Sequence, residues 1–128
     1  MSIGMLVRRR GTISSLALAA SGIGIALQPN QAASALGLSA TSSRGVAETR
    51  IGLGGTFAGL GAWALLRRRP DAYRAVGATW LGAAITRVLT LQVDEPEPDW
   101  TFWAYLAGEV TLGLGGLTTP RRRPDVDG

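Results

Sequence analysis

The chain has 128 residues with a net charge of +4, contains neither cysteine nor histidine, and is 46% hydrophobic with 18 glycines. This length fits one domain, and the composition favours lipid surroundings over water. The missing cysteine and histidine exclude disulfides, zinc fingers and imidazole chemistry, so any chemistry would depend on carboxylates, arginine, hydroxyls and tryptophan. No third acidic ligand stands beside the paired carboxylates, and we predict no catalytic residue, metal site or cofactor. Arginine triplets at residues 8–10, 67–69 and 121–123 lie between or beside the apolar stretches. They do not form a positively charged face along the protein, which argues against a nucleic-acid partner.

The first predicted helix covers residues 12–28, an uncharged apolar run that follows the first arginine triplet and ends near Pro29. Ala33-Ser34-Ala35 resembles a signal-peptide cleavage site, so a cleaved first segment is the alternative to a retained helix. The second helix is predicted at residues 45–66. A small, polar stretch precedes it and ends in Thr41-Ser42-Ser43, which offers an N-cap.

Two further helices are predicted at residues 73–93 and 100–118. The link at 67–71 is a tight polar turn, and the link at 94–99 is acidic and interrupted by prolines. Each helix is close to the roughly 20 residues that cross the hydrocarbon core of a bilayer. We therefore expect an all-α, four-helix transmembrane bundle formed by residues 11–119.

The arginine triplets also set the expected orientation. They precede the first helix, follow the second and follow the fourth, whereas the link between the third and fourth is acidic. The positive-inside rule then predicts an up-down-up-down topology in the inner (cytoplasmic) membrane, with a basic N-terminus (residues 1–10) and a tail (residues 120–128) that are both cytoplasmic. The expected partner is the lipid bilayer.

Glycines in the second and fourth helices are spaced for close helix contact. Those of the second helix share one face and include a GxxxG motif, and small residues let helices approach closely in lipid. We favour packing within the chain, and a homodimer seam is the alternative. The predicted packing residues are Gly52, Gly55, Gly59, Gly113 and Gly116.

Charged residues inside the predicted membrane helices form the candidate site. A charge near the bilayer centre costs about 2.5 to 3.5 kcal/mol on insertion scales, so we expect pairing or a wet cavity. Counted at about 1.5 Å per residue, Arg87 and Glu109 lie at matching heights, whereas Glu48 lies farther out. The site comprises Glu48, Arg50, Arg87 and Glu109, with Trp80, Phe102 and Tyr105 lining it.

These charges have two interpretations. They form ion pairs that fix the helix register, or they line a polar pathway, open to the outside, that binds a ligand, ion or proton. We favour a non-enzymatic protein that is structural or binds a small amphipathic ligand or lipid in the outer half. One alternative is a proton-coupled or ion transporter, with Glu109 titrating against Arg87. A second alternative is an enzyme that modifies a lipid or quinone.

Short motifs carry a family resemblance. They are Ala47-Glu48-Thr49-Arg50-Ile51-Gly52-Leu53-Gly54-Gly55 opening the second helix, Thr86-Arg87-Val88-Leu89 in the third with Asp94 just beyond, and Glu109 in the fourth. In these residues the chain resembles the DUF4345 family of small, four-span bacterial membrane proteins, over about residues 12–117. The resemblance implies the helical architecture and no particular activity, because the family has none assigned.

Overall fold

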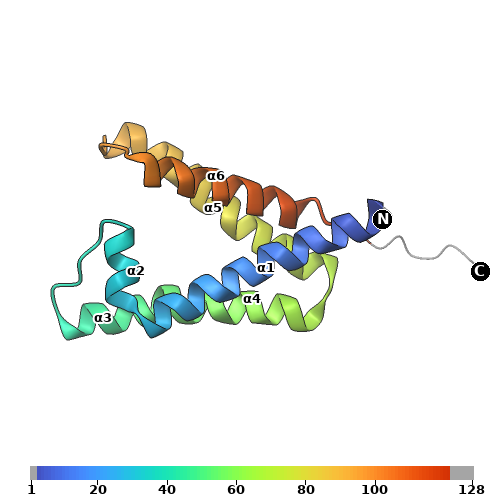
Figure 1. Ribbon diagram of the computed structural model, residues 1–128, viewed down its shortest axis with the longest axis horizontal. Helices are drawn as coiled ribbons and strands as arrows, with labels where there is room; N and C mark the ends of the chain where they lie inside the picture. The colour runs from blue at the N-terminus through green and yellow to red at the C-terminus, as the bar shows by residue number, and fades with distance from the viewer. Residues whose placement is uncertain (1–2, 122–128) are drawn as a thin grey trace, which may run out of the picture. The chain divides into compact units, whose positions relative to one another are not determined.

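The computed structural model describes residues 3–121, and all regular structure in that range is helical (Figure 1). The predicted all-α fold class is therefore confirmed. The expected cytoplasmic ends, residues 1–10 and 120–128, fall partly outside the described residues. In chain order the helices are α1 (Ile3–Leu27), α2 (Pro29–Ala35), α3 (Ser43–Thr49), η1 (Arg50–Gly55), α4 (Thr56–Arg67), α5 (Pro70–Val93) and α6 (Trp100–Leu117).

The stretch predicted as a polar link before the second helix contains the short helix α2. Pro29 stands in its first turn, where a missing N–H group is no loss. Gly37 ends the helix with a φ of 71°, a left-handed conformation that glycine adopts without steric cost. The amides of Gly37 and Leu38 then donate to the carbonyls of Ser34 and Ala33, at 3.0 and 2.8 Å. This is the hydrogen-bond pattern of a Schellman helix end.

Residues 43–67 form one helical run in which α3, η1 and α4 follow one another without a break. Ser42 is its N-cap, and its hydroxyl oxygen accepts a hydrogen bond from the Gly45 amide at 3.0 Å. The middle segment, η1, is a π-helix with the sequence RIGLGG. A π-helical segment places an additional residue in the turn, so side chains before and after it no longer share the faces of a regular α-helix.

The described residues group into two compact units. The hairpin unit, Met1–Ser14 with Arg68–Gly128, contains the first part of α1 together with α5 and α6. The α4 unit, Ser15–Arg67, contains the rest of α1 with α2, α3, η1 and α4. Helix α1 is continuous and contributes to both units.

In the α4 unit, α1 packs closely against η1 and α4 through small residues. A Cβ atom added to Gly61 would lie 2.5 Å from the backbone nitrogen of Ala19, and one added to Gly54 would lie 2.8 Å from that of Ala26. The backbones therefore touch, which only glycine permits at these two positions.

The glycines predicted to pack in this unit do not lie at the contact between α1 and the run at 43–67. Added Cβ atoms at Gly52 and Gly59 would meet nothing within 4 Å, and one at Gly55 would meet only the Arg50 carbonyl oxygen at 4.0 Å. The predicted glycine face is thus not the contact face between α1 and α4. The contact is made instead by Gly54, Ala58 and Gly61, whose spacing of four and three places them on a neighbouring face of the same helical run.

In the hairpin unit, α5 and α6 pack along their lengths (Figure 1). A Cβ atom on Gly113 would lie 2.6 Å from Cγ of Leu81, and one on Gly116 would lie 2.6 Å from Cα of Gly77. These two predicted packing glycines do lie at a helix contact. Their lack of a side chain lets the two helices approach closely at the end where α6 finishes.

Polar side chains join α1 to both helices of the hairpin unit. The Ser14 hydroxyl donates to the Leu112 carbonyl of α6 at 2.8 Å. The Trp80 indole N–H of α5 donates to the Ser14 carbonyl at 3.2 Å. The Thr12 hydroxyl donates to the Tyr73 hydroxyl at 3.3 Å. Such small polar groups hold helices together in apolar surroundings.

Two helices of the described chain are long and apolar enough to cross a membrane, over Arg9–Leu27 and Pro70–Val93. Only 33% and 17% of these stretches are buried. A core helix of a soluble protein or a signal sequence passes the same test of length and composition.

Candidate functional site

The hairpin of α5 and α6 positions the candidate site. Helix α5 begins at Pro70 and ends at Val93, and α6 begins after Asp99, whose carboxylate accepts hydrogen bonds from the Phe102 amide at 3.0 Å and the Thr101 hydroxyl at 2.6 Å. These hydrogen bonds hold the pKa of the Asp99 carboxyl below its usual range. The capped, antiparallel arrangement brings the end of α5 opposite the start of α6.

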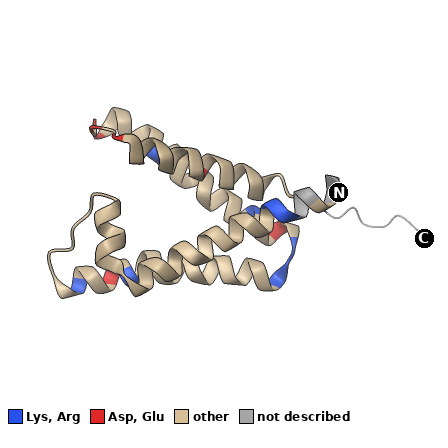
Figure 2. Cartoon of the chain, in the orientation of Figure 1, with Lys and Arg blue, Asp and Glu red and all other residues tan. Residues whose placement is uncertain are grey.

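Arg87 of α5 and Glu109 of α6 form an ion pair with two hydrogen bonds. Nε of Arg87 donates to Oε2 of Glu109 at 2.9 Å, and Nη2 donates to Oε1 at 2.6 Å. The side chains are 21% and 10% exposed. The helices are uncharged over most of their length, so this pair lies apart from other charged residues of the hairpin (Figure 2). A bidentate geometry of this kind is the strongest that arginine and a carboxylate form.

Two aromatic rings of α6 lie beside the guanidinium group. The Arg87 Cζ atom is 5.2 Å from the ring centre of Phe102 and 5.4 Å from that of Tyr105. At these distances the ring quadrupole attracts the cation. Phe102 also packs edge to face against Trp103, with ring centres 5.4 Å apart. The rings thus limit access of water to the ion pair from the α6 side.

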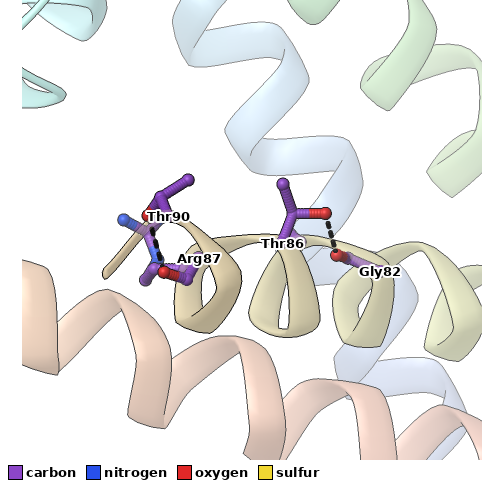
Figure 3. Close-up of a pocket in the computed structure, with 5 residues that line it drawn as sticks. Gly82, Thr86, Arg87 and Thr90 are labelled. Carbon is purple, nitrogen blue, oxygen red and sulfur yellow. Dashed lines mark hydrogen bonds between the residues drawn. The ribbon is translucent and has the colours of Figure 1, made fainter. Parts of the chain in front are cut away.

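A shallow groove of about 380 Å³ runs along α5 at Arg87 (Figure 3). It is lined by Gly82, Ala83, Thr86, Arg87 and Thr90. Thr86 donates its hydroxyl proton to the Gly82 carbonyl at 2.9 Å, and Thr90 donates to the Arg87 carbonyl at 2.7 Å. Both threonine donors are therefore committed to the backbone of their own helix. Sequence reasoning missed Gly82, Thr86 and Thr90 as lining residues, although their spacing of four places them on one helical face.

The two charged residues predicted on the second helix have partners within the α4 unit. Arg50 donates from Nη1 to the Ala26 carbonyl, near the C-terminal end of α1, at 2.5 Å. Glu48 lies 3.7 Å from Arg44 one turn away, with both side chains largely exposed. A cation at the end of α1 also interacts favourably with the helix dipole. The structure therefore gives these two residues local contacts and joins only Arg87 and Glu109 in the hairpin unit.

Trp80, predicted to line the site, has a contact of another kind. Its indole N–H binds the Ser14 carbonyl of α1, so it ties helices together. The described residues contain no group of three carboxylate, histidine or cysteine side chains that could hold a metal ion. The arrangement at Arg87 thus offers hydrogen-bond donors and a groove.

The family relationship rests on most of the chain. A family model described as "Domain of unknown function (DUF4345)" matches residues 9–118, a range that contains every predicted site residue. No curated protein and no solved structure matches the chain. The predicted resemblance is confirmed by the extent of the match, and the chain belongs to the DUF4345 family.

Proposed function

We propose that this protein is a four-span integral membrane protein that binds a small amphipathic molecule at Arg87 of the α5 and α6 hairpin. The observation that carries the proposal is the Arg87–Glu109 pair, which lies in an apolar helical hairpin and leaves part of the guanidinium group uncommitted. Ionisable residues within membrane helices are costly, and they mark functional sites by default.

The distribution of large apolar side chains supports a membrane setting. The buried hydrophobic residues are mostly alanines, whereas large side chains such as Ile85, Leu89 and Val93 on α5 are 60%, 57% and 78% exposed. A soluble protein buries such residues and does not expose long apolar faces. Helices that pack through small residues and turn large ones outward are typical of proteins dissolved in lipid.

Four spans are proposed from length and charge together. Helix α6 has 18 residues, and α3, η1 and α4 together cover residues 43–67. Glu109 and several glycines make α6 less apolar, and the π-helical segment divides the run at 43–67. These features explain why neither stretch passes the test of length and composition for a spanning helix. Arginines at 67–69 and acidic residues at 94–99 bracket α5, which agrees with a cytoplasmic link on one side and an outer link on the other.

The packing of α1 supports its retention as the first span. Ser14 binds both α5 and α6, and Gly22 contacts Ala58 of α4 backbone to backbone. Cleavage after Ala35 would remove these contacts and leave polar groups of the remaining helices without partners. A retained α1 makes the number of spans even, so both termini would lie on one side, and the arginine triplets favour the cytoplasm as that side.

The binding function is tested with the double variant Arg87→Met/Glu109→Leu. Replacing a buried ion pair by apolar residues of similar size is often neutral for stability, so the variant should fold. Native mass spectrometry of the protein purified from membranes in detergent should show a bound small molecule in the wild type and not in the variant. A variant that folds and retains the same bound molecule would contradict a site at Arg87.

A further inference from the structure

The hydrogen-bond donors at the groove come from one side chain. Of the five N–H donors of arginine, two bind Glu109, and within the described residues the other three have no partner. The hydroxyl protons of Thr86 and Thr90 bind backbone carbonyls, and Gly82 and Ala83 offer no polar side chain. A molecule in the groove therefore meets donors only on Arg87, and these require an acceptor.

The charge of the site limits which acceptor fits. Arg87 and Glu109 together are neutral, so an anionic head group would leave an uncompensated negative charge next to the Glu109 carboxylate. An unpaired charge in apolar surroundings is strongly unfavourable. An uncharged acceptor oxygen accepts the free N–H groups without changing the net charge.

The rest of the groove suits an apolar body. Thr86 and Thr90 project from the same side of α5 (Figure 3), and their hydroxyls are tied down, so their methyl groups remain to contact a ligand. The missing side chain at Gly82 leaves space, because a Cβ atom there would meet nothing within 4 Å. The volume of about 380 Å³ falls within the range of small-molecule sites, about 300 to 1,000 Å³.

We infer that the groove at Arg87 binds an uncharged amphiphile whose head group is a carbonyl oxygen, as in an ester, a ketone or a quinone. The inference rests on the proposed function and names the chemical class of the ligand at the same site. Arg87 donates to the carbonyl, Glu109 holds the guanidinium in place, and the apolar tail lies along α5 toward lipid.

The inference is tested with three probes of equal chain length, methyl dodecanoate, dodecyl phosphate and dodecane. Each is added to the full-length protein in detergent, and the one-to-one adduct is measured by native mass spectrometry. Hydrogen bonds from a charged donor should make the ester bind roughly tenfold or more tightly than dodecane. Dodecyl phosphate should bind no more tightly than the ester.

Two glycine variants separate the groove from the rest of the hairpin. Gly82→Leu fills the groove, whereas Gly108→Leu adds the same side chain to α6, where an added Cβ atom also meets nothing within 4 Å. We expect the first variant to lose most of the ester adduct and the matched control to keep it. The Arg87→Met/Glu109→Leu variant should bind the ester no better than dodecane.

The outcomes distinguish this inference from the proposed function. Tighter binding of dodecyl phosphate, equal binding of ester and dodecane, or an unaffected Gly82→Leu variant would overturn the carbonyl class while a bound amphiphile remained. A molecule that co-purifies while none of the probes binds would also overturn it. If neither a co-purified molecule nor any probe is seen on the wild type, the proposed binding function fails as well.

Discussion

At Arg87 and Glu109 the geometry and the surroundings have opposite effects on stability. Both side chains are largely removed from solvent, which disfavours their charges, and two short hydrogen bonds offset that cost. The favourable part depends on both partners being present. Loss of one partner leaves the other as an unpaired charge in apolar surroundings.

We therefore expect Arg87→Ala or Glu109→Ala alone to destabilise the protein by about 3 to 5 kcal/mol, because each leaves a buried charge. The Arg87→Met/Glu109→Leu double variant should be close to the wild type. Thermal unfolding of the purified protein in detergent measures all of these. If the destabilisation of the double variant Arg87→Ala/Glu109→Ala equals the sum of the two single effects, the two residues do not interact.

Asp99 provides a pH-dependent contribution at the start of α6. Hydrogen bonds from Thr101 and Phe102 lower its pKa, so the ionised form stabilises the folded state. This contribution is complete above the ordinary aspartate pKa of about 3.9 and is lost as pH falls through the lower value of the folded protein. Acid should therefore weaken the first turn of α6.

The matched control for this effect is Asp99→Asn, since asparagine caps a helix about as well and does not titrate. We expect the thermal midpoint of the wild type to fall more than that of the variant between neutral pH and pH of about 3. Asp99→Ala should be less stable than both at neutral pH. Equal acid sensitivity of wild type and Asp99→Asn would exclude the cap as the titrating group.

Part of the site followed from the sequence, and part required the structure. Counting residues along two apolar helices placed Arg87 and Glu109 at one height, because helix rise per residue is constant. The same count placed Arg50 in the outer half but did not reveal its partner, the Ala26 carbonyl near the end of α1. The groove could not be predicted from the sequence either, because part of its space exists only where Gly82 has no side chain.

Among the elements, the contact between α1 and α4 depends on small residues. Ala19 and Ala26 of α1 touch Gly61 and Gly54 of the facing run. Positions only two residues away, such as Gly59, are open. Neighbouring glycines of one helix should therefore respond differently to the same substitution.

Gly61→Leu should destabilise the protein by about 1 to 3 kcal/mol or more, because the new side chain meets backbone atoms. Gly59→Leu should not destabilise the protein, because the position is open and leucine favours a helix over glycine by up to about 1 kcal/mol. Thermal unfolding distinguishes the two. A change of oligomeric state in Gly59→Leu, seen by native mass spectrometry, would instead support the homodimer alternative.

The helices themselves were largely predictable, and the irregular segments were not. Apolar runs between charged links placed helices close to the run at 43–67 and to α5 and α6, and Thr41-Ser42-Ser43 held the N-cap found at Ser42. The end of α1 was also close, but its start at Ile3 lies nine residues before the predicted one, because the helix continues through the arginine triplet. Helix α2 was missed, because its sequence PNQAASA has no apolar periodicity. The π-helical segment was missed too, since its glycines fit a regular helix equally well in sequence.

For the molecule as a whole, the proposed topology rests on charge at the links. Arginines at 67–69 end α4, and acidic residues at 94–99 precede α6. Positively charged links remain in the cytoplasm during insertion, whereas acidic links have little effect on orientation. The two links should therefore lie on opposite sides of the membrane.

The chain contains no cysteine, so single cysteines report topology without any other substitution. We expect Glu97→Cys to react with a membrane-impermeant maleimide in cells whose outer layers have been removed and whose cytoplasmic membrane is intact. Arg68→Cys should react only after the membrane is permeabilised. Labelling of both sites from the outside would contradict the proposed orientation, and recovery of the label without detergent in the soluble fraction would contradict membrane insertion.

Segment η1 has a consequence for insertions and deletions along the chain. A π-helical turn accommodates one residue more than an α-helical turn, so removing one residue from 50–55 would restore a regular helix without breaking it. The residues before and after the deletion would keep their faces, because the π-helical turn had absorbed the additional residue, whereas the same deletion inside α4 or α5 would rotate one flank by about 100°. When a residue at 51–55 is removed, Arg50 would therefore stay aligned with the Ala26 carbonyl, and this stretch should tolerate a deletion better than the regular helices around it.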